Sequence, residues 1–103
     1  MPAVRVAALG ELLAGGLRRV DVNGTAIVLA RVGDAVYACS DTCAHQGGPL
    51  SEGRLSGTRL ACPWHGWIYD VRTGQCVLPG RGARGPQYPV RVDSDEVWLE
   101  VGG

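Results

Sequence analysis

The chain has 103 residues, 46% of them hydrophobic, and its ten acidic and ten basic side chains leave no net charge at neutral pH. A chain of this length forms one domain with a single hydrophobic core, and it is too short for a catalytic domain beside a second one. The charge balance excludes the basic field that nucleic-acid binding requires. The sequence has neither the apolar run of a signal peptide nor the ~20 apolar residues of a membrane span. We therefore expect a cytoplasmic protein that contacts neither nucleic acid nor a membrane.

The first third of the chain predicts short strands joined by tight turns. The strand-forming runs are residues 4–7, 18–22, 25–31 and 35–38. Between the second and third runs lies Asn23-Gly24, the strongest short hairpin signal, because both turn positions need positive φ. A further turn is predicted at Gly33-Asp34. The glycine-bounded stretch at residues 9–16 allows at most one helical turn.

The middle of the chain, from Cys39 to about Pro79, is rich in glycine and proline and predicts a loop-dominated region. Beyond it, residues 80–86 form a loop rich in glycine and arginine, which either orients an acidic partner or is a solvated connection. The remaining strand and hairpin predictions are residues 54–61, 67–76, 88–92 and 97–101. Closely spaced strands with turn residues between them and no helical period indicate an all-β sandwich or barrel.

Two short stretches of the middle region carry side chains that bind metals. Cys43 and His45 form a C-x-H pair, Cys62 and His65 form a C-x2-H pair, and sixteen residues separate His45 from Cys62. The chain has only two histidines, and each lies in register with a cysteine. A cysteine and a histidine this close in one tight loop stay near each other. Each loop is therefore expected to give one thiolate and one imidazole to a shared centre.

Two kinds of site use two cysteines and two histidines. One is a structural zinc site, whose usual spacing pairs cysteine with cysteine and histidine with histidine. Here both pairs are mixed, and the pattern resembles the signature of the Rieske family, whose [2Fe–2S] cluster has two cysteines on one iron and two histidines on the other. The resemblance implies that Cys43 and Cys62 bind one iron, and His45 and His65 the other. A zinc-stabilised binding module without a redox role stays as an alternative.

The resemblance to the Rieske family covers nearly the full chain and includes the run at residues 70–74. It implies an all-β fold in which two antiparallel sheets form a β-sandwich base, residues 1–38 and 80–103. A smaller, loop-rich cluster-binding subdomain, residues 39–79, lies on that base. It also implies that Leu78-Pro79 belongs to a third loop that covers the cluster.

The same residues resemble the ferredoxin components of bacterial ring-hydroxylating oxygenases. That resemblance implies a monomeric one-electron carrier with one [2Fe–2S] cluster and no catalytic site of its own. Its partners would be a flavin-dependent ferredoxin reductase and a terminal oxygenase of aromatic hydrocarbon catabolism. An alternative is a Rieske-like small subunit that is permanently assembled in a larger oxidoreductase, such as nitrite reductase.

Departures from the high-potential respiratory branch of the family bear on the midpoint potential. That branch joins its two loops by a disulfide, whereas here Gly48 and Trp64 occupy the cysteine positions. It also has a serine that donates to a bridging sulfide, where this chain has Trp67, and a tyrosine that donates to a cysteine ligand, retained here as Tyr69. Donors to sulfur raise the potential of such clusters, which spans roughly −150 to +300 mV. We expect a potential in the lower part of that range, raised by Tyr69 unless that side chain is simply part of the core.

The two cysteines outside the motif are Cys39 and Cys76. Free cysteines are among the most buried residue types and behave as small hydrophobic side chains. We therefore expect both to be buried thiols, in preference to a disulfide or a reactive thiol.

Overall fold

The computed structural model describes residues 3–41, 49–64, 66–78 and 87–100. The strands are β1 (Ala3–Ala8), β2 (Leu17–Val22), β3 (Thr25–Val32), β4 (Ala35–Ser40), β5 (Arg54–Ser56), β6 (Arg59–Ala61), β7 (Ile68–Asp70), β8 (Cys76–Leu78), β9 (Gln87–Tyr88), β10 (Val90–Asp93) and β11 (Glu96–Glu100). Two short 3₁₀ turns, η1 (Leu9–Glu11) and η2 (Leu50–Glu52), are the only helical elements of these residues. No helix among them is long and apolar enough to cross a membrane. The all-β prediction is confirmed.

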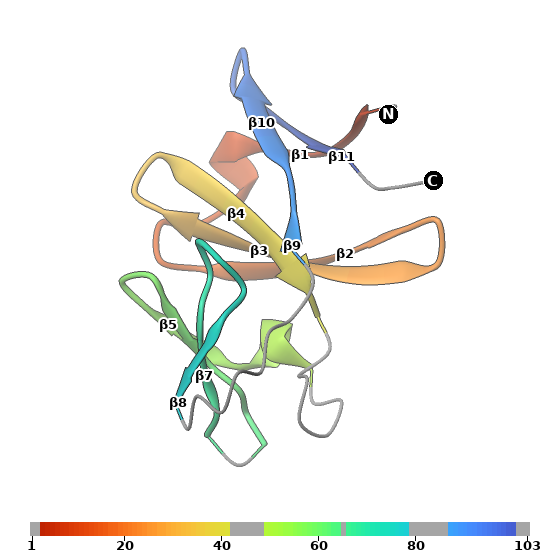
Figure 1. The fold of residues 1–103 in the computed structure, drawn as a ribbon. Coiled ribbons are helices and arrows are strands. Elements are labelled where there is room, and N and C mark those ends of the chain that lie inside the picture. Colours follow the sequence, from red (N-terminus) through yellow and green to blue (C-terminus); the bar gives the residue numbers. More distant parts are fainter. Residues whose placement is uncertain (1–2, 42–48, 65, 79–86, 101–103) are drawn as a thin grey trace.

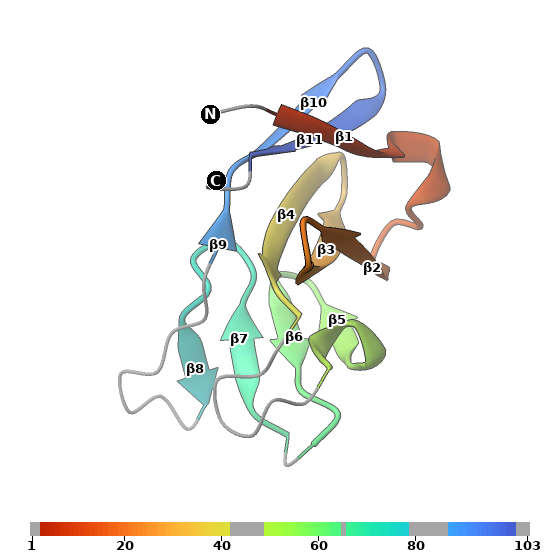
Figure 2. The same ribbon diagram turned by 90° about the vertical axis from the view of Figure 1, so that its right-hand side faces the viewer.

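The strands form three antiparallel sheets arranged in tiers (Figures 1 and 2). The upper tier has the strand order β1-β11-β10, the middle tier β2-β3-β4-β9, and the lower tier β5-β6-β7-β8. Both views show the middle sheet between the other two. The lower sheet is the one whose strands flank the second cysteine–histidine stretch.

The β2–β3 turn forms where the sequence predicts it, and the β10–β11 turn lies between the strands predicted at residues 88–92 and 97–101. Asn23 and Gly24 have φ angles of 52° and 81°, and Ser94 and Asp95 have φ angles of 51° and 62°. Two successive residues with positive φ give a turn whose twist matches that of the flanking strands. These turns set the registers of the β2–β3 and β10–β11 hairpins.

β3 is the central strand of the molecule because both of its faces are buried. Ile27 and Leu29 pack into one core cluster with residues of the upper sheet, while Val28 and Ala30 pack into a second cluster with residues of the lower sheet. A strand buried on both faces is a continuous apolar run with no polar alternation. Each fully buried large aliphatic side chain contributes roughly 1.5–3 kcal/mol of transfer free energy. The same strand therefore couples the upper sheet to the sheet that carries the candidate site.

The strand predicted at residues 88–92 is two strands that belong to different sheets. Tyr88 in β9 pairs with Ala38 of the middle sheet, whereas Val90 in β10 pairs with Leu99 of the upper sheet. Pro89 lies between them, and proline has no N–H to continue a ladder. Figure 1 shows the chain passing from one tier to the next at this position.

Candidate metal centre

One of the four predicted ligands lies in the described part of the chain. Cys62 directly follows β6 and is only 4% exposed. Cys43, His45 and His65 lie outside the described residues, as do Gly48, Pro79 and the loop at residues 80–86. The geometry on either side of these residues is described, and it determines how each ligand-bearing stretch begins and ends.

The second stretch is closed by hydrogen bonds of the backbone. The Cys62 N–H donates to the carbonyl oxygen of Trp67 over 2.7 Å. The Trp64 N–H points back at the Cys62 sulfur over 3.4 Å. Gly66 has a φ of 70°, a backbone conformation that glycine adopts without strain. The chain therefore reverses within six residues, and the buried Cys62 sulfur accepts an N–H as a thiolate ligand does.

The first stretch is closed by a residue that the sequence analysis did not single out, Asp41. Its carbonyl oxygen accepts the Leu50 N–H over 2.7 Å, and its N–H donates to Ala26 of β3 over 3.0 Å. Its carboxylate Oδ1 accepts the Ser51 N–H over 2.5 Å, and its Oδ2 lies 3.7 Å from Nε of Arg19. These contacts hold together the two ends of the segment at residues 42–49. The available signal was an aspartate two residues before Cys43, a residue type that often caps nearby N–H groups.

The flanks of the two stretches meet at Gly53 and Ala61. The Gly53 N–H donates to the carbonyl oxygen of Leu50, at the end of η2. A Cβ added to Gly53 would overlap the carbonyl oxygen of Ala61, the residue before Cys62. The flanks also share one core cluster, whose buried members are Val28, Ala30, Cys39, Leu50, Leu60, Cys62, Tyr69, Val71 and Cys76. The two stretches are therefore held by one packed unit.

Cys39 and Cys76 are both buried and free, which confirms the prediction for them. Burial raises the pKa of the Cys39 thiol to about 11, so this thiol stays protonated at neutral pH. It donates a long hydrogen bond of 3.6 Å to the carbonyl oxygen of Val71. Cys76 donates to the carbonyl oxygen of Leu78 over 3.2 Å.

The turn after β7 is built around the carboxylate of Asp70. This carboxylate accepts the Arg72 N–H over 2.9 Å and two guanidinium N–H groups of Arg72 over 3.1 and 2.8 Å. The Asp70 carbonyl oxygen accepts the Gly74 N–H over 2.7 Å. The hydrogen bonds from the Arg72 side chain, followed by that from its backbone, hold the pKa of Asp70 below its usual value, although burial opposes them. The run at residues 70–74 is thus a hydrogen-bonded turn between β7 and β8 of the lower sheet.

The aromatic side chains near Cys62 differ in exposure. Tyr69 is buried in the same core cluster as Cys62, and Trp67 packs against that cluster from its edge. Trp64, in contrast, is 48% exposed, and Leu78 is also exposed. The burial of Tyr69 fits its interpretation as core, and its predicted donation to a sulfur stays a prediction.

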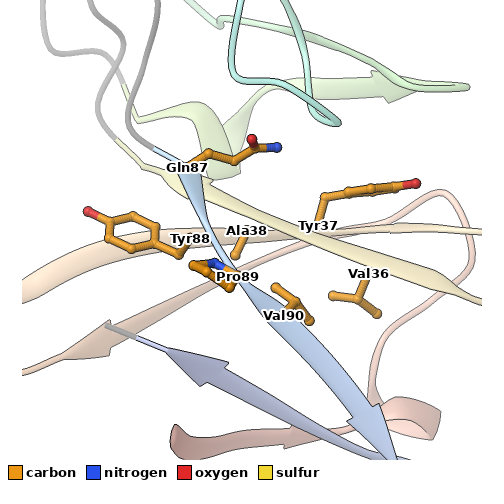
Figure 3. Close-up of a pocket in the computed structure, with 7 residues that line it drawn as sticks. All are labelled: Val36, Tyr37, Ala38, Gln87, Tyr88, Pro89 and Val90. Atoms are coloured by element: carbon orange, nitrogen blue, oxygen red, sulfur yellow. The ribbon is translucent and has the colours of Figure 1, made fainter. Parts of the chain in front are cut away.

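An open groove of about 330 Å³ lies beside β4, β9 and β10. It is lined by Val36, Tyr37, Ala38, Gln87, Tyr88, Pro89 and Val90 (Figure 3). These side chains include no carboxylate, imidazole, amine or thiol, and the ionisable groups among them are the phenols of Tyr37 and Tyr88. Gln87 extends from the groove toward the β7–β8 turn, where its Nε2 donates to the Val71 carbonyl oxygen over 2.7 Å.

A comparison with known families decides the kind of site. The family model described as the Rieske [2Fe–2S] domain matches residues 3–89. The chain belongs to the Rieske [2Fe–2S] domain family. This membership assigns the cofactor as a [2Fe–2S] cluster, one per chain, and removes the zinc alternative.

Several relatives of this Rieske chain have names that identify them as ferredoxins. Ferredoxin CarAc of Metapseudomonas resinovorans is 40% identical in an alignment of 82 residues that covers 74% of this chain and 77% of that protein. The ferredoxin of carbazole 1,9a-dioxygenase from Nocardioides aromaticivorans has a TM-score of 0.89 and 33% identity, over 96% of this chain and 97% of that ferredoxin. A chain in the complex of reduced oxygenase and oxidised ferredoxin of carbazole 1,9a-dioxygenase has a TM-score of 0.88 and 35% identity, over 94% and 91% of the two chains. This Rieske chain is therefore a ferredoxin, an electron carrier and not a catalyst.

Proposed function

We propose that this ferredoxin carries single electrons from a flavin-dependent reductase to a terminal oxygenase that hydroxylates an aromatic ring. The observation that carries the proposal is the match to the carbazole dioxygenase ferredoxin over 96% of this chain and 97% of that one. A second solved structure, the complex of reduced oxygenase and oxidised ferredoxin in carbazole 1,9a-dioxygenase, supports a terminal oxygenase as the electron acceptor. We further propose that the protein is cytoplasmic and acts as a monomer.

We propose that Cys43 and Cys62 bind one iron of the cluster and that His45 and His65 bind the other. Cys62 supports this ligand set because its sulfur is buried and already accepts an N–H from Trp64. Two thiolates and two neutral imidazoles are the donors that a Rieske cluster takes. The bound cluster supplies a centre that accepts and releases one electron.

The described residues contribute shielding and orientation. The core cluster around Cys62 excludes water from its sulfur, and the Cys62–Trp67 hydrogen bond fixes where the second ligand stretch begins and ends. Trp67 has no hydroxyl to donate to a sulfide, so we expect a midpoint potential in the lower part of the Rieske range. We also propose the division of the chain that the sequence predicts, in which residues 1–38 and 80–103 form the base and residues 39–79 hold the cluster.

The ligand set is tested by comparing Cys62→Ala with Cys76→Ala. Both cysteines are buried in the same core cluster, so each substitution removes one buried sulfur. We expect Cys76→Ala to retain iron, acid-labile sulfide and the electron paramagnetic resonance (EPR) signal of a reduced Rieske cluster. Cys62→Ala should lose all three. Equal cluster content in the two variants would contradict the assignment of Cys62.

The carrier role is tested by reconstitution. The oxidised protein is mixed with NADH and a flavin-dependent reductase of an aromatic dioxygenase system, and a terminal oxygenase with its substrate is then added. We expect reduction followed by reoxidation, with hydroxylated product formed only when the ferredoxin is present. Isolation of the protein in a complex that withstands dilution, with no turnover as a free carrier, would favour the alternative of a permanent subunit.

A further inference from the structure

Asp41 has the least exposed charged side chain among the described residues, since the whole residue is only 2% exposed. It lies just after β4, at the point where the middle sheet ends and the segment leading to Cys43 begins. Its four contacts reach three elements: Arg19 of β2, Ala26 of β3, and Leu50 and Ser51 of η2. A carboxylate buried this fully is costly unless it is hydrogen-bonded and paired. Both of its oxygens are engaged here.

We propose that Asp41 is a positioning residue of the Rieske centre, which closes the first ligand segment and places a fixed negative charge beside the cluster, thereby lowering the midpoint potential. The inference rests on the proposed ligand set, because its distance argument starts from Cys43. Two residues of chain span at most ~7 Å between Cα atoms, so the Asp41 backbone cannot lie farther than this from that of Cys43.

The sign of the effect follows from electrostatics. Reduction adds one negative charge to the cluster, and a nearby carboxylate opposes that addition. Charges in a buried, poorly solvated position are screened much less than charges at the surface. Arg19 acts in the opposite direction, but its side chain is 53% exposed and its Nε lies 3.7 Å from the carboxylate, so it compensates only in part.

Substitution of Asp41 by asparagine removes the charge of the side chain and keeps its shape. Asp41→Asn keeps an oxygen that accepts the Ser51 N–H and removes the negative charge. Arg19→Gln removes the compensating cation from an exposed position, where loss of folding is not expected. Asp21→Asn is the matched control, because among the described residues Asp21 also pairs with Arg19, and its side chain is 62% exposed.

The experiment measures the midpoint potential of the four cluster-loaded proteins at one pH and one ionic strength. We expect Asp41→Asn to raise the ratio of reduced to oxidised protein about tenfold at a fixed electrode potential, which is about 59 mV for a one-electron couple. Arg19→Gln should lower that ratio about threefold, and Asp21→Asn should change it less than twofold. Hydrogen exchange of the Leu50 and Ser51 amides, measured in the same samples, reports whether the segment remains closed.

Opposite shifts for Asp41→Asn and Arg19→Gln, with Asp21→Asn near wild type, support the proposal. If Asp41→Asn fails to retain its cluster, the folded Arg19→Gln variant decides alone: a lowered potential supports the proposal, and a potential equal to that of Asp21→Asn overturns it. Equal potentials in Asp41→Asn and Asp21→Asn also overturn it. Equal cluster content in Cys62→Ala and Cys76→Ala would instead refute the ligand set, so the two failures are distinguishable.

Discussion

The two ligand-bearing stretches of this ferredoxin are held in different ways. The ends of the first, at Asp41 and Leu50, are joined through a buried carboxylate whose partners lie on β2, β3 and η2. The second, between Cys62 and Trp67, is closed within six residues of chain by one backbone hydrogen bond and by the Trp64 N–H that points at the Cys62 sulfur. The first arrangement depends on one charged side chain and on the packing of distant elements. The second arrangement depends mainly on hydrogen bonds donated by backbone N–H groups. A substitution of a side chain other than Cys62 therefore removes fewer of the contacts that close it.

The largest expected effect comes from Gly53, where the flanks of both stretches meet. In Gly53→Ala the new Cβ would overlap the Ala61 carbonyl oxygen, and no side chain can move aside to relieve the overlap. We expect a loss of roughly 3 kcal/mol in the free energy of unfolding, together with poor cluster retention. Urea unfolding and iron analysis check this. Gly10→Ala is the control, because a Cβ added to Gly10 meets nothing within 4 Å. Equal stability of the two variants would show that the flanks are not in rigid contact.

The next effect concerns Tyr69, which is buried beside Cys62 in the shared core cluster. If its hydroxyl donates to a ligand sulfur, Tyr69→Phe lowers the midpoint potential and costs about 1 kcal/mol of stability. Tyr88→Phe on the base serves as the control. Redox titration of both variants tests the hypothesis, and a midpoint unchanged from wild type in Tyr69→Phe would assign that residue to the core alone.

A weaker effect is expected at the hydrogen bonds that join the lower sheet to the middle sheet. The Val71 carbonyl oxygen accepts hydrogen bonds from Gln87 and from Cys39, which lie on β9 and β4 of the middle sheet. Gln87→Leu should cost about 1 kcal/mol and increase hydrogen exchange in the β7–β8 turn. Gln75→Leu makes the same substitution at an exposed position of that turn. A larger loss of unfolding free energy in Gln75→Leu than in Gln87→Leu would mean that the hydrogen bond from Gln87 to Val71 contributes little to stability.

Much of this architecture follows from local sequence signals. The Asn23-Gly24 pair predicts the β2–β3 turn, because the positive φ angles required there suit those two residues. The ligand set is predictable as a hypothesis because both histidines of the chain pair with a cysteine at short spacing. These signals depend on neighbours within a few residues, which a sequence displays directly.

The features that escaped prediction depend on partners far along the chain. The separation of β9 from β10 at Pro89 arises because β4 and β11 offer edges in two different sheets. The burial of Asp41 depends on Arg19, 22 residues earlier, and on Ser51, ten residues later. An aspartate before a loop indicates a cap, but the local sequence does not distinguish a buried cap from a solvated one.

A small, pH-dependent effect is expected from the turn at the far end of the lower sheet. The native pKa of Asp70 is lowered, chiefly by hydrogen bonds from Arg72, so its ionised form stabilises the fold. That contribution is fully present above the ordinary value of 3.8 and is lost as the pH falls below it through the native pKa. Urea midpoints measured between pH 5 and pH 3 should fall more for wild type than for Arg72→Gln. Parallel falls would mean that the pair does not stabilise the turn.

The smallest expected effect is at Cys39. Its thiol donates a hydrogen bond from β4 of the middle sheet to the carbonyl oxygen of Val71, which follows β7 of the lower sheet. Its pKa of about 11 leaves it almost entirely protonated at pH 8, and its burial denies access to reagents. We expect iodoacetamide to leave Cys39 unalkylated in the folded protein and to alkylate it fully in urea. Mass spectrometry of the peptide that contains Cys39 measures the extent of alkylation. Labelling of the folded protein faster than its global unfolding would show that β4 separates locally from the lower sheet. Because β4 leads into Asp41, such opening would release the first ligand stretch, and because Cys39 shares its core cluster with Cys62, it would also loosen the packing around the second.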